Sequence, residues 1–175
     1  MAHVIFLRGV NVGGHRVFRP TVLVRELEHL DVVNIGAAGT FVVRAPITQA
    51  KLRAEVARRL PFQADIMICP GRSIARLVAR DFFAGERART DLVRFVSVMS
   101  RRAREVPSLP LHIPSRDGWL VRVLAIEDRF VVGVYRRQMK AVGHLGQLDR
   151  IFGTPVTTRN WNTLAAVARV LKDPD

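Results

Sequence analysis

The stretch HVIFLRGVNVGG, residues 3–14, has the pattern of a strand followed by a glycine-rich turn. Residues 3–8 form a short apolar run that ends at Arg8, which is typical of a strand. Positions 4–7 are apolar without alternation, so we expect this strand to be buried on both faces. The glycines that follow, and Pro20 beyond them, predict a turn that leads into a helix.

Together with this strand, the residues up to about position 80 predict a β-α-β-β-α-β order followed by one more helix. Thr48 can cap the second helix, and Ser73 can cap the third, because their hydroxyls accept from backbone N–H groups. The expected strands cover residues 3–8, 32–36, 40–44 and 64–69, and the expected helices cover residues 20–30, 48–60 and 73–80. This order is that of a ferredoxin-like, split βαβ domain.

The second half of the chain resembles a diverged repeat of the first. Arg72-Ser73-Ile74-x-x-Leu77 matches Arg159-Asn160-Trp161-x-x-Leu164 at an offset of 159 − 72 = 87 positions. Strands are expected at 92–99, 119–126, 129–135 and 154–158, and helices at 143–151 and 160–171. We therefore predict an α+β fold of two ferredoxin-like halves related by internal duplication, with a first half at 1–82, a linker at 83–89 and a second half at 90–175.

Composition excludes several classes of protein. The 175 residues are 49% apolar, which excludes a disordered chain. No stretch approaches the ~20 apolar residues of a membrane span, and the N-terminus lacks the pattern of a signal peptide, so we expect a cytoplasmic protein that does not engage a membrane. One cysteine and five scattered histidines favour no metal site, and no motif indicates a cofactor.

The charge balance is strongly basic. Lys and Arg total 28 against 15 Asp and Glu, which gives +13, and 25 of the cations are Arg. Either a GC-rich genome or a polyanion partner explains this excess, because guanidinium forks match phosphate. Clusters of arginine can be structural, as solvated faces of helices, or functional, as contacts to phosphate groups. The candidate nucleic-acid-binding residues are Arg72, Arg76, Arg80, Arg136, Arg137 and Lys140.

The loop Gly9–Gly14 has two interpretations. Its glycines let the chain turn with positive φ, and its backbone N–H groups could instead cradle an anion. It is no P-loop, because His15 and Arg16 stand where Lys and a hydroxyl residue are needed.

The segment TTRNWNT, residues 157–163, opens the last predicted helix. Thr158 or Asn160 can serve as a helix cap, but a cation at Arg159 opposes the helix dipole and suggests a paired carboxylate or a bound anion. The candidate site for a small anionic ligand therefore joins both segments and comprises Arg8, Asn11, Gly13, Gly14, Thr158, Arg159, Asn160 and Asn162.

These two segments carry a family resemblance. LRGVNVGGHR and TTRNWNT resemble the signatures that open and close the bacterial domain-of-unknown-function family 1697. The resemblance implies an α+β fold with two similar halves and supplies no catalytic residue. Members usually have a Ser-Gly-Asn turn before the third strand, where this chain has Ala38-Gly39-Thr40, which argues against a polar site there.

Two further residue types are expected to be structural. Phe6, Phe41, Phe95 and Phe130 fall on the first and third strands of each half, where some RNA-binding domains display stacking aromatics, but apolar neighbours favour the core. Cys69 ends an apolar strand, which favours a buried, inert thiol.

The sequence thus favours binding of nucleic acid or another polyanion through arginine-rich faces. The alternative is an enzyme or binder for a small anionic ligand at the two signature segments. Whether the chain catalyses a reaction, and its oligomeric state, are left open by the residues alone.

Overall fold

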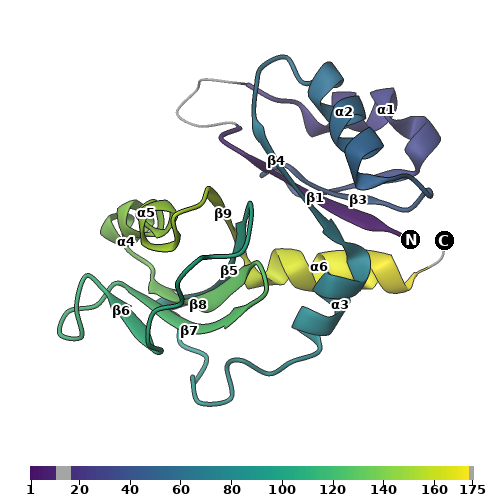
Figure 1. Cartoon of the computed structure of the whole chain (residues 1–175). Coiled ribbons are helices and arrows are strands. Elements are labelled where there is room, and N and C mark those ends of the chain that lie inside the picture. Colours follow the sequence, from purple (N-terminus) through teal and green to yellow (C-terminus); the bar gives the residue numbers. More distant parts are fainter. Residues whose placement is uncertain (11–16, 174–175) are drawn as a thin grey trace. The chain divides into compact units, whose positions relative to one another are not determined.

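The computed structural model describes residues 1–10 and 17–173 and shows a mixed α+β protein with two antiparallel sheets (Figure 1). Contacts divide the chain into two compact units, of which the first comprises Met1–Ala79 with Asn162–Asp175 and the second comprises Arg80–Trp161. The halves expected from sequence were 1–82 and 90–175. The two divisions differ in two places, because residues 80–89 group with the second unit and the last helix groups with the first.

The first unit holds a four-stranded sheet in the order β2-β3-β1-β4, with every neighbouring pair antiparallel. Its elements are β1 (His3–Arg8), α1 (Pro20–Glu26), the 3-10 helix η1 (Glu28–Leu30), β2 (Val32–Ile35), β3 (Thr40–Val43), α2 (Gln49–Arg59), β4 (Asp65–Pro70), α3 (Gly71–Val78) and nearly all of α6 (Trp161–Lys172). The order of elements up to β4 is the one predicted from apolar spacing.

The core of the first unit lies between its sheet and the helices α1 and α2 (Figure 1). Ile5, Phe41 and Leu52 are fully buried in it, and each such side chain contributes about 2 kcal/mol through burial. Val4 and Phe6 point to the opposite face of β1 and are also 0% exposed, so the prediction that this strand is buried on both faces is confirmed.

Helix boundaries follow local chemistry. Thr48 caps α2 as predicted, since its Oγ1 accepts from the Lys51 N–H at 3.3 Å. The predicted cap at Ser73 is wrong, because α3 begins at Gly71 and its N-cap residue is Pro70. Proline has no backbone N–H, so this position has no donor that needs a partner. The helix ends at Val78, so Arg80 lies outside it.

The second unit holds a five-stranded sheet in the order β6-β7-β8-β5-β9. Its elements are β5 (Leu92–Met99), β6 (Leu111–Ile113), β7 (Val121–Glu127), β8 (Phe130–Arg136), α4 (Met139–Leu145), α5 (Leu148–Phe152) and β9 (Val156–Asn160). Phe95, Val131 and Phe152 belong to the core that forms where α5 packs against the sheet. The strands β7-β8-β5-β9 repeat the order of β2-β3-β1-β4.

Two features of this unit differ from the sequence-based prediction. Residues 101–117 contribute the edge strand β6, which was not predicted. The single helix expected at 143–151 is two shorter helices, α4 and α5, and α4 starts four residues earlier at Met139. The phenylalanines expected in the core are there, at 0–3% exposure, and Cys69 is buried as expected.

Within the described part of the chain, no helix is both long enough and apolar enough to cross a membrane.

Candidate nucleic-acid interface

The first signature segment begins with a residue that already has a partner. Arg8 ends β1 opposite Asp65 on β4, and its Nη1 donates to Asp65 Oδ2 at 2.9 Å. Gly9 has a φ of 76°, which glycine adopts without strain and which both a plain turn and an anion-binding loop allow. Asn11, Gly13 and Gly14 lie outside the described residues.

The second signature segment is mostly strand. Thr158, Arg159 and Asn160 are the last residues of β9, and α6 begins at Trp161. Thr158 therefore does not cap the helix, and its hydroxyl instead lies 2.6 Å from the hydroxyl of Ser97 on β5, its partner in the sheet.

Arg159 is the most buried cation of the predicted site, at 7% exposure. Its Nη1 donates to Thr157 Oγ1 at 2.7 Å and to the Thr158 carbonyl at 3.0 Å. Burial lowers the pKa of Arg159 to about 10, so the side chain remains charged at neutral pH. Both bonds are made to residues of its own strand, β9.

The small-ligand site predicted from sequence draws on both units. Arg8 and Asn162 belong to the first unit, and Thr158 to Asn160 belong to the second. Their convergence on one ligand stays a prediction.

Among the predicted nucleic-acid-binding residues, Arg136 and Arg80 make structural contacts. Arg136 donates from Nε to the Trp119 carbonyl at 2.8 Å, lies 3.7 Å from Asp91 Oδ2, and has its guanidinium 4.2 Å from the Trp119 ring centre. Arg80 pairs with Glu127 and stacks over Phe82 at 5.1 Å. Both charges are therefore partly neutralised within the second unit.

Residues 80–91, which include the expected linker, contact the rest of the second unit through ion pairs and through arginine–aromatic contacts. Arg122 Nη2 donates to Glu86 Oε2 at 2.5 Å, and Arg94 lies over the Phe83 ring at 4.7 Å. The Phe83 ring also meets the edge of Trp161, with centres 5.1 Å apart. Several arginines thus hold this segment in place, a role that the charge pattern alone did not suggest.

The remaining predicted cations are exposed. Arg72 and Arg76 lie one turn apart on α3, and Lys140 lies on α4. Within residues 1–10 and 17–173, no acceptor or carboxylate pairs with these three side chains. Arg137 is exposed too, but its Nε donates to the Thr90 carbonyl at 3.1 Å.

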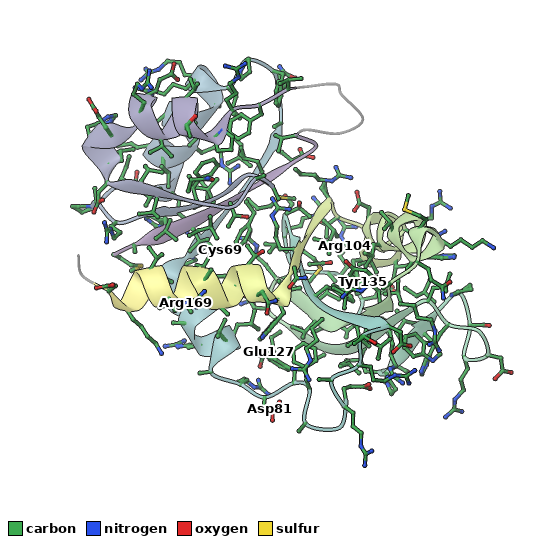
Figure 2. All side chains as sticks on the ribbon, turned by 180° about the vertical axis from the view of Figure 1, so that it is seen from behind. Cys69, Asp81, Arg104, Glu127, Tyr135 and Arg169 are labelled. Carbon is green, nitrogen blue, oxygen red and sulfur yellow. The ribbon has the colours of Figure 1, made fainter. Side chains whose placement is uncertain are left out.

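Sequence reasoning missed two cations on α6. Arg169 and Lys172 are exposed and lie three positions apart. Neither side chain has a hydrogen-bond or salt-bridge partner among the described residues. Arg169 is labelled in Figure 2. Their spacing opposite Leu164 and Val167 was the signal that could have revealed them.

Helices α3 and α6 touch each other in the first unit. A Cβ built on Gly71 would lie 2.8 Å from Leu171 Cδ2, so the first turn of α3 lies against the last turn of α6. Arg72 and Lys172 each follow a residue of this contact. Neither helix contains an Asp or Glu. We call the four exposed cations Arg72, Arg76, Arg169 and Lys172 the basic helix pair.

Comparison with known proteins identifies the family. The family model described as "Protein of unknown function (DUF1697)" matches residues 1–110. The chain belongs to this family. The conserved bacterial protein SP0830 from Streptococcus pneumoniae has a similar fold, with a TM-score of 0.62 and 13% identity over 97% of this chain and 98% of that one. No curated protein matches the sequence. The family is described as one of unknown function, so membership assigns no reaction to this chain.

Proposed function

We propose that this DUF1697 protein binds nucleic acid or another polyanion through the basic helix pair. The observation that carries the proposal is the set of four exposed cations on two contacting helices that contain no acidic residue. Guanidinium and ammonium groups without a carboxylate partner are the groups that contact phosphates along a nucleic-acid backbone.

The charge of the whole chain supports the same function. A formal charge of +13 on 175 residues attracts polyanions over a distance of about 10 Å at moderate salt. The exposed cations Arg137 and Lys140 of the second unit add to this field. Arg80 and Arg136 contribute less, because Glu127 and Asp91 lie beside them.

Binding to a labelled 20-nucleotide strand and a 20-base-pair duplex, followed by fluorescence anisotropy, tests the proposal. We expect Arg72→Gln with Arg76→Gln to weaken binding about tenfold, because two phosphate contacts are lost. The matched control replaces Arg104 and Arg116, two exposed arginines of the second unit, by Gln. An equal loss in both double variants would show that net charge alone binds the nucleic acid and would refute the proposal.

We further propose that each unit is a ferredoxin-like fold and that the two arose by duplication. The repeated strand order and the match of Arg72-Ser73-Ile74 to Arg159-Asn160-Trp161 support this. In the second unit β6 stands at the sheet edge, in the connection where the first unit has α1.

A further inference from the structure

A cavity of about 220 Å³ lies beside α1 in the first unit and is not part of the basic helix pair. Its inner wall is apolar, because Phe18 and Leu23 line it and are 6% and 2% exposed. The Phe18 ring meets the edge of Phe41 with centres 6.1 Å apart, which fixes its orientation. The cavity therefore has a preformed apolar floor.

The mouth of this cavity is apolar as well. Val17 and Val22 line it and are 66% and 46% exposed, so two aliphatic side chains lie on its solvent side. Pro61 forms part of the same wall. An apolar cavity of about 150 Å³ can hold a benzene ring, so this one has room for a substituted ring or a branched aliphatic chain.

Two arginines border the cavity, and they differ in their partners. Arg59 donates to the Glu26 carbonyl at 3.1 Å, to the Glu55 carbonyl at 3.0 Å and to the Glu55 carboxylate. Desolvation raises the pKa of Glu55, but the bonds and charges of Arg59 and Arg58 outweigh it and leave this pKa below its usual value. Arg59 is therefore already neutralised by an ionised partner.

Arg19 is exposed, and no other described residue accepts a hydrogen bond from its guanidinium. A planar guanidinium at the edge of an apolar cavity matches a carboxylate on an apolar body, because the fork can donate two parallel bonds. We propose that this cavity binds a small monocarboxylate whose aromatic ring or branched chain fills the apolar space while its carboxylate pairs with Arg19. This inference is independent of the polyanion function, since it uses none of the basic helix pair.

An NMR titration of the ¹⁵N-labelled full chain with 4-methylphenylacetate tests the proposal. We expect saturable shifts of the amides of Val17, Phe18, Val22, Leu23 and Arg59. The neutral probe 4-methylphenylacetamide should bind about tenfold more weakly, because it lacks the charge-assisted bonds to Arg19. Absence of saturable shifts up to about 10 mM, or equal binding of both probes, would overturn the proposal.

Two variants and one control variant locate the site. Arg19→Gln should abolish the preference for the acid over the amide. Arg25→Gln should retain it, because Arg25 is an exposed arginine of α1, the helix whose N-cap residue is Arg19. Val22→Trp should block the cavity and remove the shifts at Leu23. A Val22→Trp protein that keeps a native spectrum and still binds the acid would show that the ligand lies elsewhere, as would an Arg25→Gln protein that loses the preference.

Discussion

Gly133 lies in the middle of β8, where a methyl group has no room. A Cβ at this position would lie 2.2 Å from the Arg122 carbonyl oxygen of β7 and 2.9 Å from Cε1 of Phe95 on β5. The oxygen belongs to the backbone of a neighbouring strand, and Phe95 is 0% exposed, so neither neighbour can withdraw without breaking the sheet or the core. We therefore predict that Gly133→Ala strongly destabilises the second unit.

The expected magnitude follows from these contacts. Overpacking a core by one methyl group costs about 1–3 kcal/mol, and a backbone neighbour at this separation puts Gly133→Ala at the upper end. With a urea m-value of about 1.5 kcal/mol/M, a loss of about 3 kcal/mol lowers the unfolding midpoint by about 2 M. The matched control is Gly143→Ala in α4, where a Cβ meets nothing within 4 Å and the change stabilises the helix by about 0.5–1 kcal/mol.

Tryptophan fluorescence during urea unfolding is the assay, because Trp119 and Trp161 are the only tryptophans and both lie in the second unit. Gly133→Ala should unfold well before wild type, and Gly143→Ala should unfold at or above it. If Gly133→Ala proves too unstable to purify, its soluble yield at several expression temperatures, compared with that of Gly143→Ala, gives the same ranking. Equal midpoints for the two alanine variants would refute the packing argument.

Three further perturbations have defined outcomes. Thr48→Ala removes the cap that accepts from the Lys51 N–H, so the free energy of unfolding should fall by about 1 kcal/mol in urea titration, whereas Thr48→Ser should keep it. Glu86→Gln weakens the contact to Arg122, so limited proteolysis should cut the 80–91 segment faster than in wild type; unchanged cleavage would contradict its fastening role. Because the folded-state pKa of Glu55 is lowered, the stability it contributes is present above its ordinary pKa of 4.5 and is lost as the pH falls through the lowered folded-state pKa. Glu55→Gln should flatten that acid limb of the pH–stability curve.

Much of the fold was predictable because strong local patterns set it. The apolar runs at 3–8 and 92–99 are strands with the predicted bounds, and Thr48 caps the helix that its hydroxyl favours. Where the local signal was weak, the prediction was incomplete. The strand at 111–113 is too short for any periodicity and lies between Pro110 and Pro114, which are typical of loops.

The grouping of α6 could not be predicted from the order of the elements. Its sequence follows β9 of the second unit, but Leu171 packs against Gly71 at the start of α3. Such a contact depends on tertiary packing between segments about 100 positions apart, which apolar spacing within a helix cannot report.

The candidate sites were predictable only in part, because a charged residue type does not reveal its partner. Arg72 and Arg76 are exposed as a basic face should be, whereas Arg136 lies against Trp119 and Asp91. The cavity near Arg19 gave no signal, since Val17 and Val22 resemble core residues until their exposure is known.

The salt dependence of nucleic-acid binding shows whether the basic helix pair contacts phosphates. If the four cations of the basic helix pair contact phosphates, the slope of log K against log salt is about −3 to −4, which weakens binding about 100-fold between 50 and 200 mM salt. Arg72→Gln with Arg76→Gln should reduce that slope by about 2. A slope near zero, or a slope that the double variant leaves unchanged, would contradict the assignment of the interface to α3 and α6.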